Sequence, residues 1–232
     1  MNILVTGTSR GIGRAIFEAL EGHEVAGHST RGGHSEIAAD LSAQGSAQAL
    51  WAQALERLGG RIDVLVNNAG IFEASPIDLA AGEWAARWER TMRVNLTASA
   101  ELCRLAVLHF LEREHGGRIV NVSSRAAYRG DSPDHWHYAA SKAGMVAMTK
   151  SIARAYAGDG ILAFAVCPGF TVTGMVDDYI ASRGGGAFLA DIPLGRPASA
   201  QEVAETVRWL AVDAPASATG AVIDVNGASF VR

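Results

Sequence analysis

Residues 3–13 read ILVTGTSRGIG, an apolar run that leads into a glycine-rich turn. The run has the length of a strand, and residues 14–21 after the turn have the pattern of a helix. Glycines let the backbone turn tightly and let a phosphate approach, while a helix start offers free N–H groups. We therefore predict a strand, a phosphate-binding turn and a helix. A turn that only links the strand to the helix is the alternative, and the absence of G-K-[ST] argues against an ATP-type loop.

Short apolar runs recur along the rest of the chain, and helical stretches separate them. The runs cover residues 64–66, 119–122, 163–166 and 222–225. One helical stretch covers residues 98–114, and another starts at the capping box Ser199-x-x-Glu202. This alternation predicts βαβ units and a parallel sheet covered on both faces. Residues 174–197 fit neither pattern, and we predict a mobile loop or lid there.

Length and composition favour one ordinary globular domain. The 232 residues are 49% hydrophobic and carry a net charge of −4 without a basic block, so we expect no nucleic-acid partner. Cys103 and Cys167 lie far apart, which argues against a disulfide framework and a cysteine zinc site. We find no apolar run of the ~18–20 residues that a membrane helix needs. The N-terminus lacks the pattern of a signal peptide, so we expect a cytoplasmic protein without a membrane partner.

Tyr138 and Lys142 form a candidate catalytic pair. They are four residues apart in a stretch with few helix breakers, so a helix would place both on one face. A nearby cation favours phenolate and would lower the tyrosine pKa from its ordinary value of ~10. The pair therefore predicts a proton donor or acceptor that works near neutral pH. An ordinary helix with one exposed lysine is the alternative.

Together these patterns resemble the short-chain dehydrogenase/reductase family over nearly the whole chain. In chain order, the matches are the turn at residues 6–13, Asp40-Leu41, the strand end Asn67-Asn68-Ala69-Gly70, Asn95, Ser123-Ser124, the Tyr138–Lys142 pair, and Pro168-Gly169 with Thr173. The resemblance implies a single Rossmann-fold domain over residues 1–232, with a doubly wound parallel sheet of about seven strands and helices on both faces. It also implies hydride transfer between a nicotinamide cofactor and a carbonyl or secondary alcohol.

The resemblance assigns roles to four catalytic residues. Tyr138 would protonate the substrate oxygen in reduction, or deprotonate the alcohol in oxidation. Lys142 would lower the tyrosine pKa and bind the nicotinamide ribose, and Asn95 would hold a water that links Lys142 to solvent. Ser124 would hydrogen-bond the substrate oxygen. We choose Ser124 because the family's catalytic serine is the second of the pair, with Ser123 as the alternative.

The resemblance also implies a set of cofactor-binding residues. They are Gly7, Ser9, Arg10, Gly11, Ile12, Gly13, Arg31, Asp40, Leu41, Asn68, Ala69, Gly70, Tyr138, Lys142, Pro168, Gly169, Thr171 and Thr173. The segment between Arg31 and Asp40 is short, so the usual helix and strand there must be abbreviated.

The end of the second predicted strand bears on the choice of cofactor. In the family, an acidic residue at this point selects NAD by binding the ribose hydroxyls and repelling a 2′-phosphate. Residues 24–31 read EVAGHSTR and have no acid at their end. Arg10 and Arg31 would instead meet a phosphate, with Ser29 and Thr30 as hydrogen-bond donors. We therefore favour NADP, with NAD as the alternative.

Within the family, the sequence most resembles the 3-oxoacyl-acyl-carrier-protein reductases and their relatives. Those reductases dock an acidic carrier protein with two arginines, where this chain has His115 and Asp159. A histidine and an aspartate argue against such a partner. By the same resemblance we expect a homodimer or homotetramer, with residues 97–114 and 138–157 at the interface.

The loop between Ser124 and Tyr138 should border the substrate. Tyr128 and Trp136 would contact an apolar or ring-bearing substrate, and Arg125 or Arg129 would meet a carboxylate; a plain surface loop is the alternative. We expect no metal, because the histidines in this loop lack a third ligand nearby. The leading prediction is NADPH-dependent ketone reduction. The alternatives are an NAD-dependent dehydrogenase of a hydroxylated ring compound or sugar, and a non-catalytic dinucleotide sensor.

Overall fold

The computed structural model describes residues 1–33, 36–113, 115–172 and 191–232. The predicted lid at residues 174–197 lies outside the described residues up to position 190, and so does Thr173.

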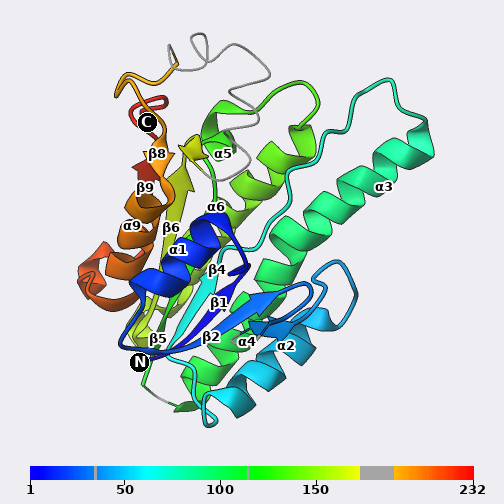
Figure 1. Ribbon diagram of the computed structural model, residues 1–232. Helices are drawn as coiled ribbons and strands as arrows, with labels where there is room; N and C mark the ends of the chain where they lie inside the picture. Colours follow the sequence, from blue (N-terminus) through cyan, green and yellow to red (C-terminus); the bar gives the residue numbers. More distant parts are fainter. Residues whose placement is uncertain (34–35, 114, 173–190) are drawn as a thin grey trace.

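A single large sheet organises the fold. Seven parallel strands form it in the described part of the chain, in the order β3-β2-β1-β4-β5-β6-β9 (Figure 1). They are β1 (Asn2–Thr6), β2 (Glu24–Ser29), β3 (Glu36–Ala38), β4 (Val64–Asn67), β5 (Gly117–Val122), β6 (Ile161–Pro168) and β9 (Val222–Val225). The chain runs outward from β1 to β3 and then returns to β4 on the other side of β1. Open parallel sheets bind ligands at such a switch point, beyond the carboxyl ends of the strands.

A small second sheet and the helices complete the molecule. The two short strands are β7 (Thr171–Val172) and β8 (Ala198–Ser199). The described helices are α1 (Gly11–Ala19), α2 (Ser46–Arg57), α3 (Ala81–Met92), α4 (Ala98–Arg113), α5 (Ala126–Arg129), α6 (Trp136–Tyr156) and α9 (Ala200–Val212), with short helical turns η1 (Arg93–Thr97), η2 (Ala157–Asp159) and η3 (Ala216–Ala218). The prediction of a doubly wound parallel sheet is confirmed.

The central strands are largely apolar because both faces of the sheet are covered. In β1, Ile3 and Val5 pack into one core with residues of α1 and α9. Leu4 points to the opposite face and packs with residues of α2 and α4. Successive strand residues point to opposite faces, so a strand between two helical layers needs an apolar residue at nearly every position. Figure 1 shows α1 and α9 together on one side of the sheet.

The longest helical run, Ala81–Arg113, joins α3, the π-helical turn η1 and α4 (Figure 1). We predicted no membrane helix, yet this run is long and apolar enough to cross a membrane by length and composition alone. Half of its most apolar stretch is buried inside the protein. Leu102, Ala106 and Phe110 of α4 lie in the core that covers one face of the sheet. We therefore interpret the run as a helix that packs within the folded protein.

The predicted capping box is present at the start of α9. The Ser199 hydroxyl accepts a hydrogen bond from the Glu202 N–H at 3.1 Å, and the Glu202 carboxylate accepts one from the Ser199 N–H at 2.8 Å. Arg196 pairs with the same carboxylate at 2.8 Å and, as the main cause, lowers the pKa of Glu202 to about 2. The two side chains of the capping box therefore each accept a hydrogen bond from a backbone N–H at the start of the helix.

Replacing Ser199 with alanine should remove the cap without changing the buried core. We expect Ser199→Ala to lower the free energy of unfolding by about 1 kcal/mol, measured by urea denaturation. Ser151→Ala is the control, because this exposed hydroxyl bonds only the Ala147 carbonyl of its own helix. Equal stability losses in the two variants would contradict a specific role for the cap.

Candidate active site

The glycine turn after β1 has a backbone that other residues would not tolerate. Gly7 has φ +75°, and a Cβ there would lie 2.8 Å from Cα of Ala69. A Cβ on Gly13 would lie 1.9 Å from the Gly7 carbonyl oxygen. Among the residues described, no side chain caps the start of α1, where Arg10 is the N-cap residue. The first N–H groups of this helix are therefore left for an anion such as a phosphate.

Asn68 and Thr6 hold the glycine turn against the end of β4. The side-chain amide of Asn68 donates to the carbonyl oxygens of Thr6 and Gly7, at 3.0 and 3.1 Å. The Thr6 hydroxyl in turn accepts from the N–H groups of Asn68 and Ala69, each at 3.0 Å. These bonds cross from one strand end to the next at the switch point. Contacts within the protein therefore fix the conformation of the glycine turn without a ligand.

His28 supports the same turn from β2, and the sequence analysis missed it. The Gly7 N–H donates to two acceptors of His28, the Nδ1 of the ring at 3.2 Å and the backbone carbonyl at 2.9 Å. The Nε2 of the ring lies 2.9 Å from the Ala39 carbonyl, so the arrangement suits a neutral ring that donates from Nε2. Burial lowers the pKa of His28, which favours this neutral form.

A carboxylate that the sequence analysis missed lies beside the glycine turn. Glu36 accepts hydrogen bonds from the hydroxyls of Thr8 at 2.8 Å and Ser29 at 2.7 Å. Ser29, expected to donate to a phosphate, therefore donates to Glu36 instead. The sequence shows no acid at the end of β2, but the short connection after this strand places the acid of β3 there. Arg10 and Arg31 are exposed, and neither forms an ion pair with a described residue.

Other predicted cofactor residues lie at the same edge of the sheet. The Asp40 carboxylate accepts from the Ser42 N–H and hydroxyl, and the hydroxyl bond is the main cause of its lowered pKa. Leu41 is buried, whereas Ser9 is exposed and Ile12 half-buried. The remaining described members lie at or just after the ends of β4 and β6, with Thr171 at the start of β7: Asn68, Ala69, Gly70, Pro168, Gly169 and Thr171.

The two helical residues of the predicted catalytic set meet the end of β5. Lys142 is buried, and its Nζ donates to the Val122 carbonyl at 2.9 Å and lies 5.8 Å from the centre of the Tyr138 ring. Ser124 hydrogen-bonds the Tyr138 side chain. Ser123 instead donates to the Lys142 carbonyl at 2.8 Å. Thus Ser124 adjoins the phenol, while Ser123 ties β5 to α6.

Burial sets the protonation of this pair. It raises the pKa of Tyr138 to about 12, although the hydrogen bond with Ser124 acts in the opposite direction. It also lowers the pKa of Lys142 to about 8. The low-dielectric surroundings disfavour the charged form of each group, so the net shift of the Tyr138 pKa is upward, opposite to the direction in which a neighbouring cation acts.

Asn95 lies in the π-helical turn and fixes the segment after β4. Its Oδ1 accepts from the Ile71 N–H at 2.8 Å, and its Nδ2 donates to the Ile71 carbonyl at 3.0 Å. The same Nδ2 lies 3.3 Å from the Ser141 hydroxyl of α6. The side chain is thus engaged with protein groups, and its predicted link to a water stays a prediction. π-Helical turns occur often at functional sites.

Most of the predicted substrate-loop contacts are made within the protein. Arg125 and Arg129 both bind the Asp191 carboxylate, at 3.3 and 2.7 Å. Tyr128 stacks on Phe230 and its hydroxyl accepts from Arg232 at 3.2 Å. These side chains are therefore engaged elsewhere, and the expectation that the arginines meet a substrate carboxylate is not supported.

Within the described part of the chain, neither the cysteines nor a metal-ligand cluster offers a further reactive centre. Both Cys103 and Cys167 are buried, and burial raises the pKa of Cys167 to about 11 and of Cys103 to about 12. Such thiols stay protonated at neutral pH and are poor nucleophiles. No cluster of three potential metal ligands is found among the described residues.

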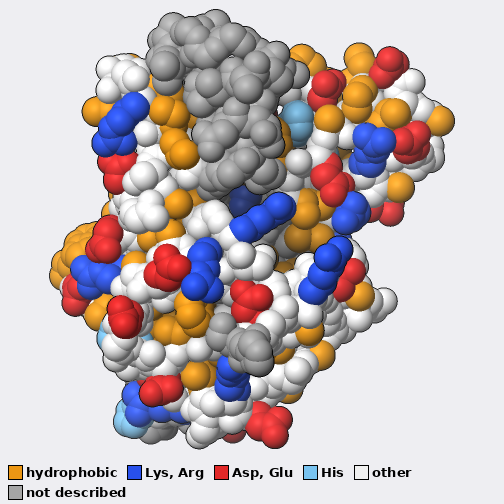
Figure 2. All heavy atoms as spheres, in the orientation of Figure 1, with side chains coloured by type: hydrophobic (Ala, Val, Ile, Leu, Met, Phe, Trp, Pro, Cys, Tyr) orange, Lys and Arg blue, Asp and Glu red, His pale blue; other side chains and the backbone are white. Residues whose placement is uncertain are grey.

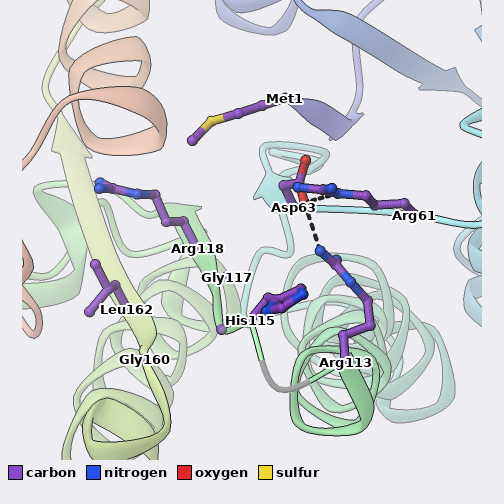
Figure 3. A pocket seen from close by; sticks show the side chains of 10 residues that line it. Met1, Arg61, Asp63, Arg113, His115, Gly117, Arg118, Gly160 and Leu162 are labelled. Carbon is purple, nitrogen blue, oxygen red and sulfur yellow. Dashed lines mark hydrogen bonds and ion pairs between the residues drawn. The ribbon is translucent and has the colours of Figure 1, made fainter.

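A cavity of about 270 Å³ lies at the opposite edge of the sheet, where β5 and β6 begin (Figure 3). Arg61, Arg113 and Arg118 line it together with His115. The Asp63 carboxylate binds Arg61 at 2.7 Å and Arg113 at 3.0 Å. Three arginines thus lie near His115, and Asp63 offsets part of their charge. The surface around His115 is more basic than the histidine side chain alone would predict. On the face seen in Figure 2, acidic and basic side chains are intermixed over much of the surface.

Comparisons with known proteins agree with this arrangement. A family model described as enoyl-(acyl carrier protein) reductase matches residues 7–228. The 3-oxoacyl-[acyl-carrier-protein] reductase FabG of Escherichia coli is 35% identical, and the match covers 98% of this chain and 96% of that protein. Nodulation protein G of a Rhizobium species is 37% identical over 97% of this chain and 94% of its own length. A structure of a putative gluconate dehydrogenase from Agrobacterium tumefaciens superposes with a TM-score of 0.87 at 29% identity, covering 100% of this chain and 96% of that one.

The buried lysine should make stability depend on pH. Because the folded pKa of Lys142, about 8, lies below its ordinary value, the folded protein releases this proton more easily than the unfolded chain does. The stability of the parent relative to Lys142→Met should therefore rise between about pH 8 and about pH 10.5, by on the order of 3 kcal/mol. Denaturant unfolding of both proteins across this range measures the difference. Lys150→Met, at an exposed site, is the control, and parallel curves for Lys142→Met and the parent would contradict the assignment.

Proposed function

This chain belongs to the short-chain dehydrogenase/reductase family and is an NAD(P)-dependent oxidoreductase of a carbonyl or alcohol substrate, and from that premise we propose that it reduces a ketone with NADPH. The observation that carries the proposal is the convergence of Ser124, Tyr138 and Lys142 at the end of β5, where Ser124 hydrogen-bonds the Tyr138 side chain and the Lys142 Nζ lies 5.8 Å from the centre of its ring. With its pKa raised to about 12, the phenol is protonated at neutral pH, as a proton donor must be. Ketone reduction needs such a donor at the substrate oxygen.

Three side chains have defined tasks in the proposed reaction. Ser124 holds and polarises the carbonyl oxygen by a hydrogen bond. Tyr138 donates its proton to that oxygen, and the Lys142 ammonium stabilises the phenolate that remains. Oxidation of an alcohol would reverse these transfers. The cofactor, when bound, supplies or accepts the hydride, and the protein positions the reactants and moves the proton.

The residues at the carboxyl edge of the sheet fit a dinucleotide. The uncapped start of α1 and the crowded glycine turn suit a diphosphate. A Cβ on Gly70 would come within 3.4 Å of the Asn95 Oδ1 and 3.5 Å of the Lys142 Nζ, so the glycine keeps the space beside the buried lysine clear. We assign the nicotinamide end to this region, with Asn95 as a positioning residue.

For the adenosine end we propose recognition of a 2′-phosphate by Arg10 and Arg31. Both guanidinium groups are exposed and lack a carboxylate partner among the described residues. The Glu36 carboxylate favours the alternative, NAD, because an acid near the ribose accepts from its hydroxyls and repels a phosphate. We rank NADP first because two guanidinium groups, Arg10 and Arg31, are available for a phosphate, whereas each Glu36 oxygen already accepts one hydrogen bond, from Thr8 or Ser29.

A 3-oxoacyl thioester carried by an acidic protein is a second candidate substrate. Relatives named for that activity match the chain, and three arginines surround His115 at the cavity of Figure 3. Asp63 offsets part of that charge. We also propose a cytoplasmic homodimer or homotetramer, supported by the exposed side chains of Leu108 and Leu111 on α4.

The proton donor can be tested by removing one oxygen atom. Tyr138→Phe should lower NADPH-dependent turnover of the best ketone by at least about 100-fold and leave the Kd for NADPH within about threefold of the parent. Tyr156→Phe, near the far end of the same helix, is the control. Retained turnover in Tyr138→Phe would overturn the mechanism.

Opposite changes at two positions should move the cofactor preference in opposite directions. We expect Arg31→Asp to weaken NADPH relative to NADH by about tenfold or more, because it removes a charge-assisted contact to the phosphate. Glu36→Gln should strengthen NADPH relative to NADH. Fluorescence titrations with both cofactors measure the ratio, and Arg57→Asp repeats the charge change at an exposed distant site. An unchanged ratio in Arg31→Asp would show that Arg31 does not meet the phosphate.

A further inference from the structure

We propose that Phe72 and His135 form an aryl-binding subsite beside Tyr138, so that the preferred substrate carries a flat ring next to its carbonyl. This inference rests on the proposed function, and it names a substrate class for that site. It concerns two segments, the one that follows β4 and the one that leads into α6. The sequence analysis placed an apolar contact at Trp136 and Tyr128 but did not consider Phe72.

Three rings meet at this point. Phe72 and His135 stack with their centroids 3.8 Å apart and an interplanar angle of 4°. Phe72 also meets the Tyr138 ring at 4.8 Å and 86°, an edge-to-face contact. Phe72 thus connects the stacked pair directly to the residue that would donate the proton. A group held against Phe72 would therefore lie beside the Tyr138 ring.

The two segments are fixed to each other and to the rest of the site. The Ser75 N–H donates to the Asp134 carbonyl at 2.8 Å, which joins the segments on one side of the stacked pair. On the other side, Asn95 binds both backbone groups of Ile71, the residue before Phe72. His135 is oriented by Ser132, whose hydroxyl lies 2.7 Å from its Nδ1. The subsite is therefore preorganised, which reduces the entropy lost on binding.

Phe72 keeps much of its surface available despite these contacts. Its side chain is 55% exposed, and the neighbouring Trp136 is 54% exposed. Exposed apolar groups that adjoin a polar reactive centre are typical of ligand sites. An aromatic ring offers a flat partner a larger contact than an alkyl chain and adds a stacking preference.

The charges around the subsite favour a neutral group over an ionic one. The Glu73 carboxylate is paired with Arg90 at 2.9 Å, on the side of α3. The arginines of the substrate loop, Arg125 and Arg129, are both bound to Asp191. Phe72 contacts the rings of His135 and Tyr138, and the Asp131 carboxylate is close enough to act on Tyr138, so an anionic substrate group is disfavoured there. We infer an apolar aryl group, not a carboxylate.

A matched pair of ketones tests the inference. Acetophenone and cyclohexyl methyl ketone have similar size and differ in the flat ring, and kcat/KM is measured for both in the parent, Phe72→Leu and Phe230→Leu. We expect the parent to prefer acetophenone, and Phe72→Leu to lower this preference by about three- to tenfold, mainly through KM. Phe230→Leu, which removes the ring stacked on Tyr128, should leave the preference unchanged.

The outcomes separate this inference from the proposed function. If the parent reduces ketones but Phe72→Leu changes both substrates equally, the subsite is refuted and the reductase stands. If neither ketone is turned over, saturation-transfer NMR still compares binding of the two ketones to the parent and to Phe72→Leu. Loss of ring-selective binding in Phe72→Leu then supports the subsite although the reaction differs. Equal NMR signals in the two proteins refute it.

Discussion

The side-chain amide of Asn68 binds the carbonyl oxygens of Thr6 and Gly7, and this contact joins two strands whose connections leave in opposite directions. Because the chain leaves β1 and β4 in opposite directions, the carboxyl edge of the sheet is open between these two strands. Without a cross-strand clamp, a glycine turn there would have many conformations, because glycine restricts its backbone least. With the clamp, and with His28 on the other side, one conformation remains. The phosphate site and the placement of the residues beyond it both depend on this arrangement.

At the other end of the site, burial has the controlling influence. Tyr138 and Lys142 lie where the ends of β5 and α6 meet, and the surroundings favour the neutral form of each. Proximity of opposite charges is only one contribution to a pKa, and it is outweighed when both groups are taken out of water. With pKa values of about 12 and about 8, Tyr138 is a neutral phenol at pH 7 and Lys142 is mostly an ammonium group, which is the combination that the proposed proton donation requires.

Much of the fold could be predicted because periodicity reports burial directly. Strands with apolar residues at nearly every position, such as β1 and β6, and the capping box at Ser199 were visible in the sequence. The contacts of Glu36 and His28 were not, because they depend on the path of a shortened connection between β2 and β3. The role of Phe72 could not be predicted for a related reason. The sequence does not show that the start of α6 places His135 against it. The direction of the Tyr138 pKa was missed because spacing shows that a cation is near but not that water is excluded.

The topology also has a consequence for how the chain reaches this state. Every pairing in the large sheet is parallel, so no two neighbouring strands can be joined by a tight hairpin. The edge pairing of β6 with β9 aligns Ala165 with Val222, two residues that are far apart along the chain. Contacts of this kind must overcome a large loop-closure entropy before they contribute, which slows folding. We therefore expect β1, β2 and β3, whose partners are close in the sequence, to associate first, and the β1–β4 and β6–β9 pairings, which both join distant residues, to form later.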